Sequence, residues 1–125
     1  MNKILSENEI KQFREEGAVF LKNKFDITWI NKLRTGIKRD IKNPSPRFKS
    51  HTIQKDVPAY LEDYWTWHLV PEFKEFVYNS PFARIASELM SAKKINLVMD
   101  NWFLREGGSK SSTPFHHDIS YFDMD

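Results

Sequence analysis

The stretch that decides how this chain is interpreted is Thr113-Pro114-Phe115-His116-His117-Asp118-Ile119-Ser120-Tyr121-Phe122. It is rich in aromatic and β-branched residues and follows a glycine-rich turn, so it is expected to form a β-strand. Successive side chains of a strand point to opposite faces, which places His116 and Asp118 on one face and His117 on the other. An imidazole and a carboxylate on one face are two of the three ligands in the 2-His-1-carboxylate arrangement that binds non-haem Fe(II).

The His-x-Asp spacing alone is a short pattern that a polar surface strand also produces by chance, so the interpretation depends on its context. The pattern lies in an aromatic segment, after a preceding strand and a helical N-terminal region. The other histidines, His51 and His68, lie in a loop and in a Trp-rich segment. Because geometry defines a metal site, both are expected to be surface or packed residues rather than ligands.

The rest of the sequence predicts helices first and strands last. Ser6 and Glu9 have the spacing of a capping box and Gly17 supplies a stop, which predicts a helix over about residues 6–16. Asp26 is expected to cap a second helix. The further elements expected are a strand at 18–21, a proline-bearing loop at 43–58, two short helices within 59–79 broken near Pro71, a helix at 80–90 and a strand at 95–105.

Composition indicates a single domain over residues 1–125. The chain is 40% hydrophobic and 14% aromatic, which is typical of a globular protein with a core. It has no cysteine, which excludes disulfides and thiolate metal sites and fits a cytoplasmic protein. The lysines are scattered and no nucleic-acid-binding motif accompanies them, so no nucleic-acid partner is expected. No stretch is long and apolar enough to predict a membrane span.

The sequence resembles the phytanoyl-CoA dioxygenase (PhyH-like) family of Fe(II)/2-oxoglutarate-dependent oxygenases. The strongest match is the run 113–118 with Tyr121-Phe122 after it, where the family typically has Thr-Pro-Trp-His-Gln-Asp and an aromatic pair. Phe115 and His117 depart from the usual Trp and Gln, while the ligand pair is kept. Further matches, in chain order, are Leu5-Ser6, Glu9-Ile10, Phe13, residues 17–23, the helix at 80–90 and the strand at 95–105.

The resemblance implies an α+β fold in which N-terminal helices pack on the first strands of an incomplete double-stranded β-helix, a jelly-roll or cupin-like architecture. It implies that His116 and Asp118 bind Fe(II), and that 2-oxoglutarate, dioxygen and a small organic or acyl substrate meet there, with ascorbate as an optional reductant. Thr113 and Asn101 would donate hydrogen bonds to 2-oxoglutarate, although both also fit plain polar strand positions. Phe115 and Phe122 would wall the iron site, which core packing alone would also explain.

The family takes its second iron-binding histidine, and the arginine that pairs with 2-oxoglutarate, from well beyond residue 125. We therefore expect this chain to be the N-terminal part of such an oxygenase and to be inactive by itself. The alternative is a non-enzymatic binding or dimerising module in which the His-x-Asp segment is inert. The oligomeric state and the substrate stay open.

Overall fold

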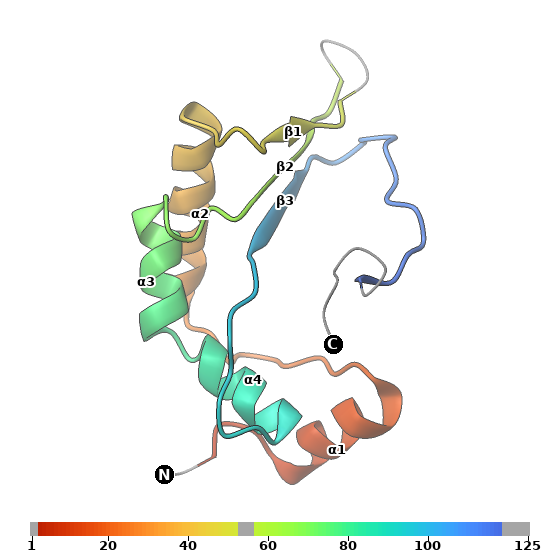
Figure 1. Cartoon of the computed structure of the whole chain (residues 1–125). Coiled ribbons are helices and arrows are strands. Elements are labelled where there is room, and N and C mark those ends of the chain that lie inside the picture. Colours follow the sequence, from red (N-terminus) through yellow and green to blue (C-terminus); the bar gives the residue numbers. More distant parts are fainter. Residues whose placement is uncertain (1–2, 53–56, 119–125) are drawn as a thin grey trace.

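The computed structural model describes residues 3–52 and 57–118, and within them the fold is α+β (Figure 1). The four helices of this part are α1 (Glu7–Glu16), α2 (Ile27–Lys42), α3 (Pro71–Asn79) and α4 (Phe82–Met90). The three strands are β1 (Lys49–Ser50), β2 (Tyr60–Tyr64) and β3 (Asn101–Arg105). None of the helices in this described part has the length and apolar character needed to cross a bilayer.

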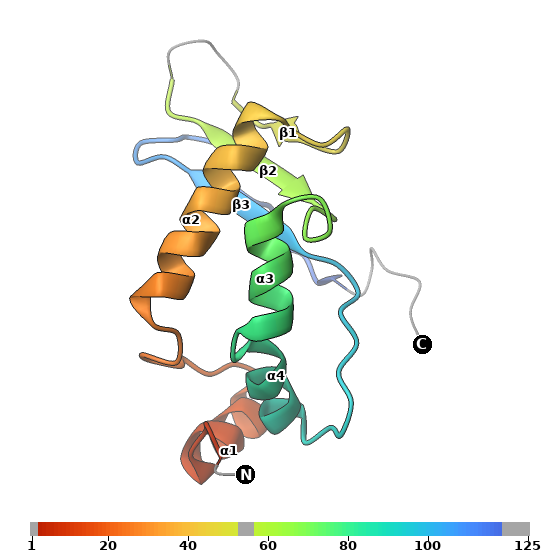
Figure 2. The same ribbon diagram turned by 90° about the vertical axis from the view of Figure 1, so that its left-hand side faces the viewer.

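The strands form one antiparallel sheet in the order β1-β2-β3. Helices α2 and α3 lie side by side and cover one face of this sheet, as Figures 1 and 2 show. The main core lies between these two helices and the sheet, where Val70, Phe73 and Trp102 are buried. Partly buried apolar residues complete it from α2, β2, β3 and the adjoining loops: Leu33, Ile37, Ile41, Phe48, Leu61, Trp67 and Leu104.

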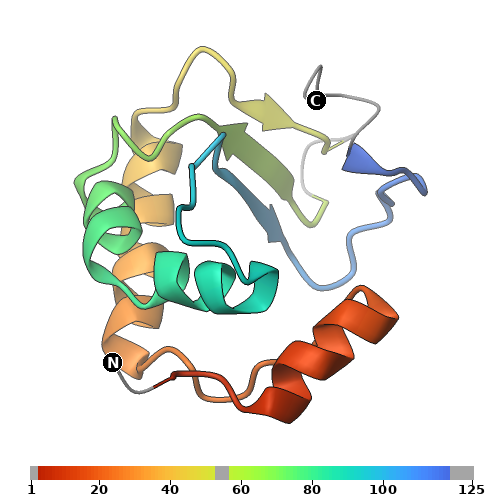
Figure 3. The same cartoon turned by 60° about the horizontal axis from the view of Figure 1, so that its bottom comes forward.

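A second, smaller core joins α1 to α4, away from the sheet (Figure 3). Its buried residues are Leu5, Ile10 and Ile85. The predicted start and stop of α1 are confirmed. Ser6 and Glu9 form a reciprocal capping box, and Gly17 closes the helix with a left-handed φ of 75°, a conformation that glycine adopts without steric cost.

The predicted helices that begin at Asp26 and near residue 80 are also confirmed, as α2 and α4. The prediction of two short helices within residues 59–79 is wrong for the first of them. Residues 60–64 form β2 instead, because they pair with β3 along their whole length. Such pairing overrides the helix-like spacing of the aromatic residues there. Pro71 does not break a helix; it stands in the first turn of α3, where its missing N–H costs nothing.

The strand predictions are wrong in three places. Residues 18–21 form no strand, and Leu21 packs instead on the core between α1 and α4. Of the strand predicted at 95–105, only Asn101–Arg105 is formed, since its partner β2 has just 5 residues. Residues 113–118 are not a strand either, and Pro114 among them has no N–H to donate to a ladder. Residues 119–122 lie outside the described part of the chain.

Gly36 tests how tightly α2 packs on α3. A Cβ at this position would lie 2.4 Å from Cε1 and 2.8 Å from Cδ1 of Phe73. Because 2.4 Å is a severe overlap, the overpacking cost should lie in the upper part of its usual range, at about 2–3 kcal/mol, and exceed the helix-propensity gain of about 1 kcal/mol. Gly36→Ala should therefore lower the free energy of unfolding by about 1–2 kcal/mol in urea titrations. Thr35→Ala, on the exposed face of the same helix, is the control and should change it by less than about 0.5 kcal/mol; an equally stable Gly36→Ala protein would contradict this packing.

The capping box predicts how stability depends on pH. The Lys24 ammonium, followed by the Ser6 backbone N–H, lowers the pKa of Glu9 to about 2. Because the folded pKa lies below the unfolded value of 4.5, this stabilisation is present above that pH and is lost as the pH falls toward 2. Glu9→Gln should thus be less stable than wild type at neutral pH but equally stable near pH 2, as measured by thermal unfolding at each pH. Glu15→Gln, on the exposed side of α1, should follow wild type throughout; a constant gap for Glu9→Gln would contradict the linkage.

Candidate functional site

The sheet face opposite α2 and α3 carries the candidate site. By strand alternation, every second side chain of β2 and β3 points to this side. The chain after β3 returns over it, as Figures 1 and 2 show. Phe103, at the centre of β3, is 53% exposed, whereas Trp102 on the helix side is buried. The residues whose side chains share the uncovered face by strand alternation are Tyr60, Glu62, Tyr64, Asn101, Phe103 and Arg105.

Tyr60 connects this face to the segment that carries the His-x-Asp pattern. Its hydroxyl lies 2.8 Å from Oγ1 of Thr113. The centroid of its ring lies 4.9 Å from that of the His51 ring and 5.7 Å from the guanidinium carbon of Arg105. Ser111 adds a second attachment, because its hydroxyl donates to the carbonyl oxygen of His51 at 2.9 Å. Residues 111–113 are therefore fastened to the sheet by side-chain hydrogen bonds rather than by a strand ladder.

His116 and Asp118 face each other at the end of this segment. Nε2 of His116 lies 3.4 Å from Oδ1 of Asp118. The strand alternation expected to bring them together is absent, since residues 116 and 117 are irregular and Asp118 has a 3₁₀ conformation. A local contact does this instead: Nδ1 of His116 lies 2.9 Å from the carbonyl oxygen of Pro114 and fixes the ring.

This geometry has a chemical consequence at Nε2. A carbonyl oxygen can only accept a hydrogen bond, so Nδ1 of His116 must carry a proton and donate it to Pro114. The other ring nitrogen, Nε2, lies 3.4 Å from Oδ1 of Asp118, and in the neutral ring it carries the lone pair with which an imidazole binds a metal. Two ligands at right angles around a first-row divalent ion, each about 2.1 Å from it, are about 3 Å apart. The His116–Asp118 pair fits such an ion as two of its ligands.

A third ligand does not accompany the pair in the structurally described residues, which contain no group of three His, Cys, Asp or Glu suited to a metal ion. His51 is engaged with Glu62, with Nε2 and Oε1 3.1 Å apart, and the ring of His68 packs beside Trp67. Both are surface or packed residues, as the sequence predicted. The pair itself is open to solvent, with 38% of the His116 side chain and 83% of the Asp118 side chain exposed.

The remaining predicted site residues do not all converge on this pair. Asn101 pairs with Tyr64 at one end of β3, whereas Thr113 is bound to Tyr60, which pairs with Arg105 at the other end. These ends are four residues apart, or about 13 Å along a strand. Phe115 is fully exposed and walls no cavity in the described part of the chain, and Phe122 lies outside it.

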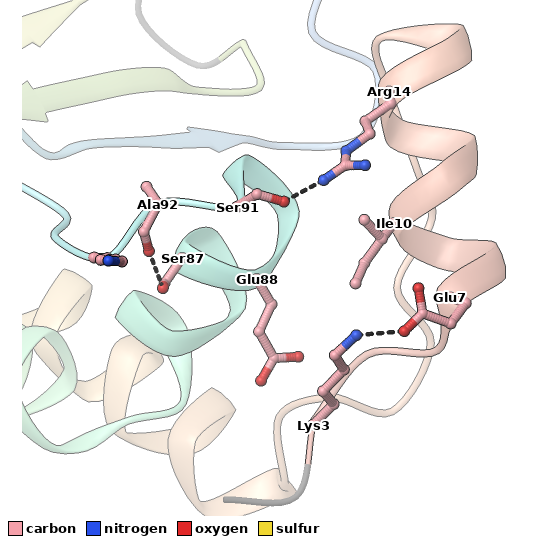
Figure 4. Close-up of a pocket in the computed structure, with 9 residues that line it drawn as sticks. Lys3, Glu7, Ile10, Arg14, Ser87, Glu88, Ser91 and Ala92 are labelled. Carbon is pink, nitrogen blue, oxygen red and sulfur yellow. Dashed lines mark hydrogen bonds and ion pairs between the residues drawn. The ribbon is translucent and has the colours of Figure 1, made fainter.

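A shallow pocket of about 290 Å³ lies elsewhere, between α1 and α4 (Figure 4). Its charged groups already serve the fold: Lys3 pairs with Glu7, and Arg14 donates to Ser91. Glu88 accepts hydrogen bonds from the backbone N–H groups of residues 4 and 5, which hold the pKa of its carboxyl below the usual value. The Arg14 and Glu88 contacts join α1 and the residues just before it to α4, so the pocket does not compete with the His116–Asp118 pair as the candidate site.

The Tyr60–Thr113 contact can be measured directly. Tyr60→Phe and Thr113→Val each remove one partner, and the double variant should show a coupling free energy of about 0.5–1.5 kcal/mol in a double-mutant cycle of unfolding. Pairing either substitution with Thr35→Ala, on the exposed face of α2, is the control and should give additive effects. Additivity of Tyr60→Phe with Thr113→Val would mean that the segment is not attached here.

Comparison with models of known protein families, with curated proteins and with solved structures gives no match for this chain.

Proposed function

We propose that this chain supplies two of the three protein ligands of the iron in a non-haem Fe(II)/2-oxoglutarate-dependent oxygenase of the PhyH-like type, which acts on a small organic or acyl substrate. The observation that carries the proposal is the facing pair, His116 Nε2 and Asp118 Oδ1, 3.4 Å apart. The 2-His-1-carboxylate set with open positions is typical of non-haem iron oxygenases. The resemblance of the run 113–118 to that family gives the pair its expected chemistry.

The chain's own residues would have separate tasks in this site. His116 and Asp118 would hold the metal, and the carbonyl of Pro114 would orient the imidazole by accepting a hydrogen bond from Nδ1, the ring nitrogen that does not bind the metal. Tyr60 would position the whole segment through Thr113. Bound iron with 2-oxoglutarate and dioxygen would supply the oxidation of a C–H bond. The second histidine and the arginine for 2-oxoglutarate would come from outside these 125 residues.

The architecture we propose for the complete enzyme is a double-stranded β-helix. In it, the sheet β1-β2-β3 would form part of one wall, with α2 and α3 on the outside and the uncovered face turned toward the metal. The position of the segment 106–118 over the uncovered face supports this arrangement (Figure 1). Asn101 would then lie at the far end of the wall from Tyr60, so we assign it no contact with the cosubstrate.

A second candidate, a binding or dimerising module with an inert His-x-Asp segment, is favoured by one observation. Strand β3 has β2 on one side only, so within the described residues it is an edge of the sheet. Edge strands present unpaired backbone groups that readily pair with another chain. The two candidates differ in what they require of His116 and Asp118: the module needs neither side chain, and metal binding needs both.

Titration with Co(II), a spectroscopic substitute for Fe(II), tests the proposal. Wild type should bind one ion per chain, weakly, with visible absorption from the bound ion. His116→Ala and Asp118→Ala should each weaken binding by at least about tenfold, because loss of even a hydrogen-bond partner of a metal ligand weakens metal affinity by about 10–100-fold.

The control is His68→Ala, because His68 is exposed and its ring packs beside Trp67. It should bind Co(II) as wild type does. Unchanged affinity in both His116→Ala and Asp118→Ala would refute the metal site and leave the inert module. Weakened binding in only one of these two variants would contradict a metal ion shared by both side chains.

A further inference from the structure

A cluster of cationic and aromatic side chains lies at the C-terminal end of β2. Arg47, in the loop after α2, and Lys49, in β1, meet Tyr64 and Trp65 there. The guanidinium carbon of Arg47 lies 6.0 Å from the ring centroid of Tyr64 and 5.6 Å from that of Trp65. Nζ of Lys49 lies 5.6 Å from the ring centroid of Tyr64. None of these four residues belongs to the proposed metal site.

Arg47 is held in place by the backbone of this cluster. Its Nε–H donates to the carbonyl oxygen of Tyr64 at 3.1 Å, and Nη2 donates to that of Trp65 at 3.2 Å. A guanidinium has five N–H donors, so three are left for a ligand. Among the residues that the structure describes, no carboxylate pairs with this half-buried cation. Arg47 is therefore an oriented positive charge with donors to spare.

Trp65 has a strained backbone that keeps its ring beside Arg47. Its φ of 56° lies in the left-handed region, which bulky side chains rarely adopt. The conformation is fixed on both sides, because the Trp65 N–H donates to the carbonyl oxygen of Asp100 at 2.9 Å and the Trp65 carbonyl accepts from Arg47. The ring belongs to neither buried core and is 47% exposed. Strain maintained in this way is concentrated at binding and catalytic sites.

The charges of the cluster indicate which ligand it fits. Oε1 of Glu62 lies 3.9 Å from Nζ of Lys49, so two positive charges and one negative charge leave one positive charge over. A carboxylate carries one negative charge, whereas a phosphate group carries up to two. The two oxygens of a carboxylate also match the paired donors of a guanidinium. The exposed indole of Trp65 favours a carboxylate that is accompanied by apolar groups.

The open setting of the cluster favours a peptide over a small molecule. Small-molecule sites are concave, but the pocket between α1 and α4 and a second one beside Gly108 are lined by other residues. Trp, Tyr and Arg are the residue types that dominate binding energy between proteins. Strand β1 has β2 on one side only within the described residues, so its other side is open to an extended segment.

We propose that Arg47 binds the carboxylate of an acidic residue in an extended peptide segment of a partner protein. The free donors of the guanidinium would donate to the two carboxylate oxygens, and apolar side chains of the segment would pack on Trp65. Lys49 would add to the attraction for the negative charge. Tyr64 and Tyr60 are four residues apart, or about 13 Å along β2, so the peptide would leave the attachment of residues 111–113 in place.

Titration of the whole chain with the tripeptide Phe-Glu-Phe, acetylated and amidated so that it has a single carboxylate, tests the proposal. In two-dimensional NMR spectra, the Trp65 indole N–H and the Arg47 Nε–H should shift with this peptide and stay fixed with Phe-Gln-Phe. Binding to Arg47→Met, followed at Trp65, should be at least about tenfold weaker, because hydrogen bonds to a charged group are lost. Arg34→Met removes an exposed arginine of α2 and should bind as wild type does.

Trp65→Gly is the second variant, which decides the matter if Arg47→Met fails to fold. Glycine adopts a positive φ without strain, so this protein should keep the dispersed amide spectrum of wild type. Its binding, followed at the Arg47 Nε–H, should be at least about fivefold weaker. Resonances that do not move with Phe-Glu-Phe, an equal response to Phe-Gln-Phe, or full affinity in Trp65→Gly would overturn the proposal. Acetate that binds as tightly as the peptide would also contradict it, because the apolar contacts would then contribute nothing.

Discussion

The antiparallel pairing of β2 with β3 is the constraint on which the rest of the structure depends. Its register sets Asp63 opposite Trp102 on the helix side and Tyr60 opposite Arg105 on the uncovered side. The first pair builds the buried layer that receives Asp40 from α2. The second provides the hydroxyl that binds Thr113. A shift of one residue would exchange the two faces and dissolve both arrangements.

The candidate metal pair is held by a short series of side-chain contacts rather than by regular secondary structure. Tyr60 and Ser111 fasten the segment to the sheet, and Pro114 orients His116. Beyond Thr113 the described chain is exposed, and the metal site we propose would need further walls and ligands to cover it. We expect this chain to bind metal weakly for the same reason, because metal affinity depends on ligand geometry and on a complete set of ligands.

Local sequence signals predicted the helices well and the sheet poorly. Ser6, Glu9 and Gly17 act within one helix, so their pattern is visible in the sequence and α1 appears where they place it. Strand β2 was read as a helix because its identity depends on β3, some forty residues later in the chain. Residues 113–118 have strand-forming composition, but no described strand pairs with them.

The candidate site was predictable only in part, for the same physical reason. The spacing of His116 and Asp118 is local, and it singled out two groups that do face each other, although through a contact to Pro114 instead of strand alternation. The Tyr60–Thr113 contact and the Asp40–Trp102 hydrogen bond were missed because each joins residues far apart in the sequence. Tyr60, in a segment predicted to be helical, and Asp40, within a helix, gave no local signal of these contacts.

The central claim is that His116 and Asp118 bind one and the same metal ion. The most direct measurement is an anomalous difference map from crystals of this chain grown with Mn(II) in place of Fe(II). The account predicts a single peak between the two side chains, within about 2.0–2.3 Å of both His116 Nε2 and Asp118 Oδ1. A map with no peak there, or with Nε2 and Oδ1 turned toward unrelated partners while the ion binds elsewhere, would contradict it.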